Sequence, residues 1–591
     1  MTRPAPASRG RAGPVTHATL LRTYLGPQRA KVALMAVLLA GSIALEISEP
    51  QIVALFIRSV QLGSPEGELI GVALLFIGIA LARQATLVVA AHASERVSWT
   101  ATNAAREDLT AHVLGLDMSF HESRSPGDLI ERIDGDVNEV AEFFSSLVVQ
   151  LLGNALLILG ILGALTVIDW RIGLTFAAVT VAGFVVLGRV AGIATGRWED
   201  DREQSARFFG SVSETIRATE DLRSSAATGY AMARFHGHLR SWLPVKIRAE
   251  AWGSAIWVVM SLVFTAGTAF AFGYGGFFFQ DGTLSLPGVY LVVAYATMLT
   301  APMEALRQQV QGLQQASAAI RRIGALFAHR PTLVDGSLAL PPGALSVRFD
   351  RVAFAYPRAG GDGPDARVLD GLSFDVPAGS TLGLVGRTGA GKSTIAHLLS
   401  RMYDPVAGRV LLGGVDTREA RLRSLRSRVG YVTQDVHLFD ATLRENLTFF
   451  DDTVGDDRLL AILDALDLRP WLDGLPAGLS TPVSAGGLSS GQAQLLALAR
   501  VFLRDPGLIV LDEPSSRLDP ATEAMVERAL DRLLAGRTLI VIAHRLDTIR
   551  RADRVIVLDD GRVIEQGDTA DLLDDPGSRF AELSRVGTVL R

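Results

Sequence analysis

The stretch GRTGAGKST at residues 386–394 decides the fold of the second half of the chain. Its members are Gly386, Arg387, Thr388, Gly389, Ala390, Gly391, Lys392, Ser393 and Thr394. They fit the pattern G-x-x-x-x-G-K-[S/T] of a phosphate-binding loop. An apolar run at 380–385 predicts a buried strand before the loop, and an apolar-periodic stretch from Ile395 predicts a helix after it. Glycines let backbone N–H groups turn onto phosphate oxygens, and the helix N-terminus adds partial positive charge.

Two side chains of this loop carry the chemistry. Lys392 is placed to reach the β- and γ-phosphates of a nucleotide, and the Ser393 hydroxyl is placed to hold Mg²⁺. The alternative is a glycine-rich turn with a chance lysine. It is disfavoured because the strand–loop–helix context also fits.

Composition indicates a large protein with membrane segments. The 591 residues exceed what one hydrophobic core can organise, so we expect at least two domains. Hydrophobic residues make up 49% and mean hydropathy is +0.29, which is high for a soluble enzyme. The net charge of −5 gives no argument for nucleic-acid binding. The absence of cysteine excludes disulfides, thiolate metal sites and a cysteine nucleophile.

Six apolar stretches in the first half are long enough to cross a bilayer, which takes roughly 20 residues. They are Val32–Ile57, Ile70–Ala91, Phe143–Ile168, Ile172–Ala194, Trp252–Phe279 and Leu286–Leu306. Residues 1–31 are basic and contain no acid, which places the N-terminus in the cytoplasm. Six crossings return the chain to that side. A signal peptide is disfavoured because the first apolar run is too long and others follow it.

Two long charged segments, 91–142 and 195–250, separate the spans on the predicted cytoplasmic side. Their pattern predicts spans that continue as helices beyond the membrane. Each has a break where a short crosswise helix could lie, at 123–128 and around 219–221, although a plain loop remains an alternative at both.

Three ionisable residues fall inside the first two spans. Glu46 and Glu49 are three residues apart, and so share one helix face, and Arg83 lies in the second span. Charges at membrane depth are costly and point to function. We expect the glutamates to line a water-filled cavity open to substrate, with a place near the outer interface or other partners as the alternative. Counted from the predicted span limits, Glu46 and Arg83 differ in depth by about 10 Å, so direct pairing is not expected.

The domain limits expected from these patterns are a cytoplasmic segment at 1–30, a transmembrane domain at 31–325, a linker at 326–344 and a nucleotide domain at 345–591. Residues 345–349 alternate apolar and polar, as in an exposed strand. Tyr356 precedes Pro357 on a loop about 30 residues before the phosphate loop. It could stack on adenine, although a lone aromatic is more often a core residue.

Two further strands end in residues suited to nucleotide hydrolysis. The apolar run 508–511 leads into Asp512 and Glu513, and ligands bind at the carboxyl ends of parallel strands. Asp512 would hold Mg²⁺ through water, and Glu513 is placed to polarise the attacking water; an acidic turn is the alternative. The strand at 538–543 ends at His544, which could reach a γ-phosphate.

A second anion-binding helix start is predicted just before the apolar-periodic helix at 493–503. The residues there are Leu488, Ser489, Ser490, Gly491 and Gln492. One nucleotide already has its phosphates at the first loop. A second such site in the same domain therefore suggests a composite site shared between two chains. Simple helix capping by the serines is the alternative.

These features, in this order, resemble those of ATP-binding cassette (ABC) transporters, and the resemblance covers nearly the whole chain. Six spans followed by one cassette are similar to a half-transporter of the exporter type. The resemblance implies a multi-domain membrane protein with an all-α six-helix transmembrane domain and an α/β P-loop NTPase cassette. It also implies ATP-driven transport in the plasma membrane with Mg²⁺, a second half-transporter chain as partner and no nucleic acid. The six spans exclude a soluble cassette ATPase.

The resemblance also implies roles for particular residues. Tyr356 resembles the adenine-stacking aromatic, 386–394 the Walker A loop, and 508–513 the Walker B strand with the catalytic glutamate. Gln434 resembles the glutamine that touches Mg²⁺ and the membrane domain, and 488–492 resembles the signature that binds the partner's ATP. Asp519 resembles the D-loop aspartate, and His544 resembles the switch histidine. The breaks near Gly127 and Glu220 resemble the coupling helices.

Three departures from the family pattern concern the dimer. Ser490 stands where glycine is usual, Arg517 stands where alanine is usual, and 481–487 lacks the usual charged residues and is shortened. Lys392 is intact. A chain with complete catalytic groups and an altered signature resembles one half of a heterodimeric exporter, so a heterodimer is favoured over a homodimer. An importer on the exporter fold, for instance for an iron chelate, and an ATP-dependent sensor or regulator stay open, and the sequence does not identify the substrate.

Overall fold

The computed structural model of the chain describes Thr19 and residues 21–357, 367–484, 486–512, 528, 536–542 and 549–589. These residues form two compact units, and each is described by itself. The first unit comprises the chain up to Val113 together with Gly127–Ala328. The second unit comprises Leu114–Pro126 together with the chain from His329 onward. The short segment at 114–126 therefore belongs with the cassette, although it lies within the first half of the sequence.

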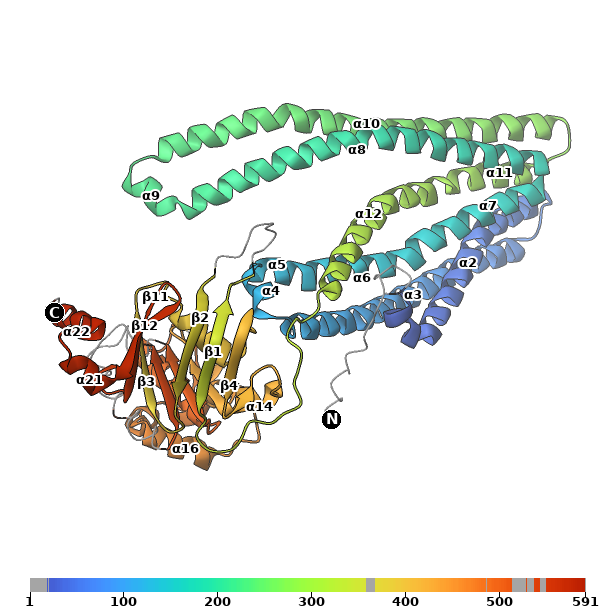
Figure 1. Cartoon of the computed structure of the whole chain (residues 1–591). Helices are drawn as coiled ribbons and strands as arrows, with labels where there is room; N and C mark the ends of the chain where they lie inside the picture. Colours follow the sequence, from blue (N-terminus) through green and yellow to red (C-terminus); the bar gives the residue numbers. More distant parts are fainter. Residues whose placement is uncertain are drawn as a thin grey trace. The chain divides into compact units, whose positions relative to one another are not determined.

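The first unit is helical (Figure 1). Where the structure describes it, its helices are α2 (Arg29–Gln61), α3 (Glu66–Leu114), α5 (Pro126–Ile130), α6 (Asp136–Ser146), α7 (Gly153–Ile168), α8 (Trp170–Arg217), α9 (Thr219–Ser224), α10 (Thr228–Gln280), α11 (Leu286–Met298) and α12 (Thr300–Ala328). Short tighter or wider turns complete it, namely η1 (Leu21–Leu25), η2 (Gly26–Gln28), η3 (Glu131–Gly135) and η4 (Leu147–Leu152). Helices dominate because a bilayer offers no water to satisfy backbone N–H and C=O groups.

Within the part of the chain that the structure describes, six helical stretches are long and apolar enough to cross a membrane, which agrees with the expected number. They are Arg22–Gln61, Glu66–Leu114, Gln150–Ile168, Trp170–Val190, Thr228–Gln280 and Leu286–Leu306. Three helices continue far beyond a bilayer's thickness: α3, α8 and α10 have 49, 48 and 53 residues. At about 1.5 Å per residue each is more than 70 Å long. The expected helical extensions are therefore confirmed.

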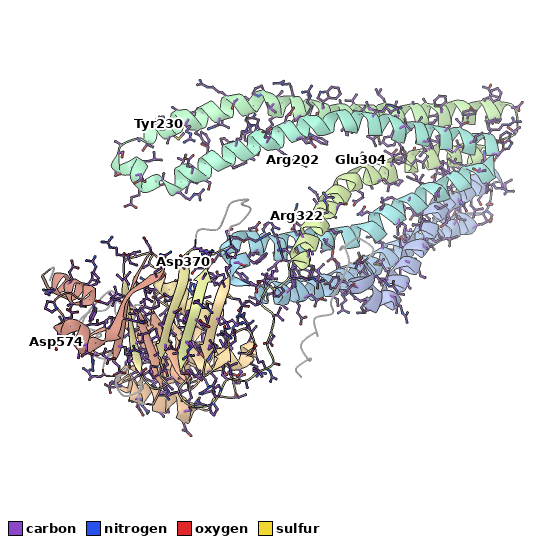
Figure 2. All side chains as sticks on the ribbon, viewed as in Figure 1. Arg202, Tyr230, Glu304, Arg322, Asp370 and Asp574 are labelled. Atoms are coloured by element: carbon purple, nitrogen blue, oxygen red, sulfur yellow. The ribbon has the colours of Figure 1, made fainter. Side chains whose placement is uncertain are left out.

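Short helices lie at both expected breaks. α4 (Met118–Glu122) and α5 flank the break at 123–125, and α9 connects α8 with α10. Figure 1 shows α8 and α10 side by side along most of their length, with α9 at one end. Figure 2 labels Arg202 on α8 and Tyr230 near the start of α10, both in the part of this pair toward α9.

A small aromatic core explains why α8 and α10 stay paired where their surfaces are charged. Phe208 of α8 is buried and contacts Phe235 and Trp242 of α10, each with ring centroids 5.2 Å apart. The Trp242 Nε1–H donates a hydrogen bond of 2.7 Å to Asp201. The rings bury apolar area, and the N–H of the half-buried indole has a hydrogen-bond partner.

The second unit holds two main sheets. The larger has the order β12-β11-β3-β10-β9-β6, parallel except for β12, and the smaller is antiparallel in the order β2-β1-β4-β5. The strands are β1 (Val347–Phe354), β2 (Leu369–Val376), β3 (Thr381–Gly386), β4 (Ala407–Leu412), β5 (Val415–Asp416), β6 (Val429–Val432), β7 (Ala441–Thr442), β8 (Pro482–Val483), β9 (Leu508–Asp512), β10 (Thr538–Ile542), β11 (Arg554–Asp559) and β12 (Arg562–Asp568). β1 is half-buried, since Val347 and Phe349 face the core.

Helices cover the larger sheet on both faces. Among the described residues, those of the second unit are α4, α13 (Lys392–Leu399), α14 (Leu422–Arg428), α15 (Leu443–Thr448), α16 (Asp456–Ala465), α17 (Arg469–Asp473), η5 (Gly478–Ser480), α18 (Ser490–Phe502), α21 (Thr569–Asp574) and α22 (Arg579–Val589). Strand β9 shows how the faces differ: Leu508 and Val510 pack in one core with α13, whereas Ile509 and Leu511 pack in another with α18. Because side chains alternate along a strand, α13 and α18 lie on opposite faces of the sheet.

Candidate functional site

The phosphate loop connects β3 to α13 at the carboxyl edge of the parallel sheet. β3 lies between β10 and β11, near the middle of the sheet. Gly389 and Gly391 have φ angles of +87° and +97°, a region that glycine enters without strain. A Cβ atom on Gly391 would also lie 2.6 Å from Leu369 Cδ2. The glycines are thus required by backbone conformation and by space, as the motif predicts.

Lys392 folds back over this loop. Its Nζ donates hydrogen bonds to the carbonyl oxygens of Gly386 and Arg387, at 2.7 and 3.0 Å, and the residue is only 6% exposed. Ser393 is exposed on the first turn of α13, whereas Thr394 is buried. The ammonium is therefore held at the loop, where it can meet phosphate oxygens.

Asp512 lies at the carboxyl end of β9, as the sequence predicts. It is 6% exposed and accepts a hydrogen bond of 3.2 Å from the Tyr431 hydroxyl of β6. Burial, and then the neighbouring Asp512 carboxylate, raise the pKa of Tyr431, so this tyrosine stays protonated and donates. The sheet order separates β9 from β3 by β10 alone, which brings Asp512 and the phosphate loop to the same edge.

Tyr356 is half-buried and held by several groups. Its hydroxyl lies 3.1 Å from Thr394 Oγ1 and 3.1 Å from His397 Nδ1. Its ring meets the rings of Phe354 and Tyr403 edge-on, with centroids 4.9 and 5.3 Å away. Burial lowers the pKa of His397, which keeps its imidazole neutral at pH 7. Tyr356 is thus packed against the core and also placed beside the phosphate loop.

Gln434 is exposed just after β6. The chain that follows it is held by hydrogen bonds from a buried arginine. Arg500 of α18 is 8% exposed and donates to the carbonyl oxygens of His437 and Asn446, both at 2.7 Å, and to Asn446 Oδ1 at 3.0 Å. Burial lowers the pKa of this guanidinium, and the three acceptors satisfy it. α18 is therefore bonded to the segment that follows Gln434.

The start of α18 forms a capping box. The Ser489 hydroxyl accepts a hydrogen bond from Gln492 N, and Gln492 Oε1 accepts one from Ser489 N, at 3.2 and 3.0 Å. Leu488 packs against the core beneath the helix, and Gly491 is buried. The capping role considered for the serines is present at Ser489. It orients the first turn and leaves Ser490 at the N1 position.

Four residues singled out in the sequence, Glu513, Arg517, Asp519 and His544, lie outside the described residues. Their expected roles stay predictions. Asp512 and Ile542 mark the last described positions of the two strands that lead to Glu513 and His544.

The expectation that Arg83 does not pair with the membrane glutamates is wrong. Arg83 Nε lies 2.9 Å from Glu49 Oε1, and its Nη1 lies 3.5 Å from Glu46 Oε2. α2 ends at Gln61, α3 begins at Glu66, and the two form one hairpin. Glu46 lies 15 residues before the end of α2 and Arg83 lies 17 residues after the start of α3, so their depths differ by only about 3 Å. The larger difference expected from the sequence comes from counting depth from opposite ends of approximate spans.

Four residues of the site were not found from the sequence, namely His397, Tyr403, Tyr431 and Arg500. A signal existed for one of them, because His397 lies four residues after Ser393 and so shares a helix face with it. The other three come from separate parts of the chain, and only the fold brings them to their partners.

Comparisons with known proteins agree with this geometry. Two family models match the chain: the ABC transporter transmembrane region at residues 32–303 and the ABC transporter domain at 369–516. The chain is 32% identical to an ATP-dependent lipid A-core flippase of Chromobacterium violaceum, over 86% of each protein. It is 30% identical to a putative multidrug export ATP-binding/permease protein of Bacillus subtilis, over 83% of this chain and 84% of the relative.

A solved structure of a bacterial Atm1-family ABC exporter with ATP bound matches with a TM-score of 0.80 and 26% identity, over 94% of this chain and 99% of that one. Both halves of the molecule are therefore accounted for: a six-span helical domain and an ATP-hydrolysing cassette coupled to transport. The chain belongs to the ABC transporter family, as a half-transporter of the exporter type.

Proposed function

We propose that this chain is one half of a dimer, preferentially a heterodimer, that exports an amphipathic substrate by alternating access with its cassette in the cytoplasm. The observation that supports a dimer is the position of α13 and α18 on opposite faces of one sheet. An ATP held by the phosphate loop of one chain then takes its second anion contact from the α18 start of another chain. Closure is driven by the tighter binding of ATP to the closed state.

Within this proposal, each candidate residue has a task. Lys392 neutralises the β- and γ-phosphates, Tyr356 carries the base, Glu513 accepts a proton from the attacking water, and His544 contacts the γ-phosphate. The oxygens of Ser393, Gln434 and Asp512 suit Mg²⁺, which prefers hard oxygen ligands. The exposed Ser393 hydroxyl and the Asp512 carboxylate at one sheet edge fit this ion. When bound, Mg²⁺ would offset negative charge on the phosphate oxygens.

The preference for a heterodimer can be tested on the chain alone. Ser490 and the uncharged loop at 481–487 depart from the family pattern, whereas Lys392 and Asp512 keep it. We expect the purified chain, reconstituted in lipid by itself, to hydrolyse ATP slowly, and addition of its partner to raise the rate at least about tenfold because two unlike sites then form. High ATPase activity of the isolated chain, with a Hill coefficient typical of two equal sites, would favour a homodimer.

The Glu46–Arg83–Glu49 cluster supports an amphipathic substrate. These three side chains are 30, 31 and 21% exposed, they lie in two helices long and apolar enough to cross a membrane, and they comprise two carboxyl groups and one guanidinium. Charges at such depth are costly, so a cluster that keeps an excess carboxylate suits contact with a polar or cationic headgroup. The flippase and multidrug-export relatives carry names that point to substrates with apolar parts.

Replacing both glutamates by glutamine is expected to lower transport of an amphipathic probe about tenfold or more, because a charge-assisted contact is lost. Transport is measured in proteoliposomes with a fluorescent phospholipid and, separately, with a cationic dye, beside basal ATPase activity. The matched control is Glu66→Gln with Glu68→Gln, two exposed acids at the outer start of α3. Unchanged transport by the Glu46/Glu49 variant would end the substrate role of the cluster.

A further inference from the structure

One turn of α2 is weakened by a proline. Pro50 is buried inside the helix, four residues after Glu46. Because proline has no backbone N–H, the Glu46 carbonyl loses the donor that an α-helix would give it, and the proline ring also crowds that carbonyl. Glu49 directly precedes the proline, and both glutamates contact Arg83. The membrane cluster therefore stands on a turn that lacks part of its helical hydrogen bonding.

Tyr295 of α11 binds the same turn from another helix. Its hydroxyl donates a hydrogen bond of 2.8 Å to the carbonyl oxygen of Ile47 and accepts one of 3.1 Å from Gln51 Nε2. These two residues are one helical turn apart and lie before and after Pro50 in the sequence. Tyr295 is only 1% exposed, so packing fixes its ring and the position of its hydroxyl.

Both hydrogen bonds of this hydroxyl lie at membrane depth. Tyr295 is near the middle of the span Leu286–Leu306, where hydrocarbon offers no water to replace a lost partner. Helix α7 packs on the same turn, because a Cβ atom on Gly160 would collide with the Ile47 side chain. α7 and α11 thus contact Ile47, whereas Arg83 of α3 contacts the two glutamates.

We propose that Tyr295 is a positioning residue: its hydroxyl fixes the turn of α2 at Pro50 and thereby holds both glutamates of the cluster beside Arg83, in the arrangement that receives a cationic headgroup. Without the hydroxyl, the weakened turn samples a wider range of bends, and the carboxylates move with the backbone that carries them. The inference rests on the proposed function, because it takes the cluster as the contact for the headgroup. It adds that a buried residue outside the cluster sets how well that headgroup binds.

Distance measurements between two spin labels test the effect on α2. The chain has no cysteine, so the labels attach to it only at introduced sites. Cysteines that replace Val37 and Leu55, both exposed, lie before and after Pro50 and about 27 Å apart along an ideal helix. In the full chain, reconstituted with its partner in nanodiscs, Tyr295→Phe is expected to widen the distance distribution about twofold.

Three further variants separate this effect from a general loss of packing. Tyr290→Phe removes a hydroxyl from the same helix and is expected to leave the width unchanged. Gln51→Leu keeps the buried tyrosine but removes one of its partners, so a smaller widening is expected, and this variant carries the test if Tyr295→Phe does not fold. Pro50→Ala restores the missing N–H, so in that background Tyr295→Phe is expected to widen nothing.

Transport in proteoliposomes gives the second readout. Tyr295→Phe is expected to raise the apparent KM for a cationic rhodamine dye about fivefold, while the maximal rate and basal ATPase activity stay within about twofold of the wild type. The reason is that headgroup binding weakens while the cassette is unchanged. Transport of a neutral dye is expected to keep its KM, because a neutral dye does not use the carboxylates.

The contrary outcomes are distinct. An unchanged width in both Tyr295→Phe and Gln51→Leu would overturn the positioning role, and so would a widening that persists in the Pro50→Ala background. An unchanged KM in Tyr295→Phe would overturn the link to headgroup binding, provided that Glu46→Gln with Glu49→Gln lowers transport. Unchanged transport in that double glutamine variant would instead contradict the substrate role within the proposed function.

Discussion

Replacing Glu513 by glutamine is expected to leave ATP binding intact and to lower ATP hydrolysis about a hundredfold or more. Glu513 is the next residue in the sequence after Asp512, which ends β9 at the sheet edge that also holds the phosphate loop. A glutamine side chain keeps the shape of glutamate but cannot accept the proton of the attacking water. Hydrolysis is measured on the full chain, with its partner, in lipid, and binding is measured with a fluorescent ATP analogue.

Two further variants serve for comparison, one that is expected to weaken ATP binding and one that is expected to change nothing. Lys392→Ala removes the ammonium that the loop carbonyls hold, and it is expected to weaken binding as well as hydrolysis. Glu419→Gln, an exposed acid of the cassette, is expected to change neither. Turnover at the wild-type rate in Glu513→Gln would remove Glu513 from the catalytic role.

Replacing Arg322 by alanine is expected to destabilise the transmembrane unit by about 3 kcal/mol, because it leaves a buried carboxylate without its charge partner. Arg322 of α12, labelled in Figure 2, donates through Nε to both carboxylate oxygens of Asp136, each at 3.0 Å, and its Nη2 also contacts Oδ1. Asp136, the first residue of α6, is 2% exposed. The hydrogen bond to Asp136 raises the pKa of Arg322, consistent with a favourable pair. Thermal unfolding in detergent measures the loss.

The neighbouring Arg321→Ala is the control, since Arg321 is exposed on the same helix. Arg322→Lys is expected to recover only part of the stability, because an ammonium cannot match both carboxylate oxygens at once. Pairing Arg322→Ala with Asp136→Asn removes the buried charge and should recover more. If Arg322→Ala unfolds at the same temperature as Arg321→Ala, the ion pair contributes little.

The parts of this molecule that depend on local pattern could be predicted from the sequence. The phosphate loop has a backbone path that only glycines follow, so Gly389 and Gly391 identify it from the residue pattern alone. The six spans follow from the length and apolarity of single stretches. The short helices α4 and α9 lie at breaks in long charged helices, where Pro126 and a change of pattern interrupt the helical run.

The parts that depend on contacts between distant segments could not be predicted. The error at Arg83 arises because depth is counted along two helices from different ends, and an uncertainty of several residues in either limit changes the depth by about 5 Å or more. In the sequence, nothing distinguishes Arg500 and Tyr403 from ordinary helix or loop residues. Arg500 bonds Asn446, 54 residues away, and Tyr403 contacts Tyr356, 47 residues away. The sequence indicates a break at 123–128, but it does not show that the whole segment 114–126 packs with the cassette unit.

The position of α13 and α18 on opposite faces of one sheet has a consequence for how such chains diverge in evolution. In a dimer that shares its two ATP sites, a substitution in α18 alters the ATP held by the sister chain, while a substitution in the phosphate loop alters the chain's own ATP. Selection on one gene therefore acts on both ATP sites of the dimer. After a gene duplication, one copy can accumulate changes such as Ser490, which alter the ATP site of the sister chain, while it still hydrolyses its own ATP. One of the two ATP sites then becomes slow, and the other continues to drive transport.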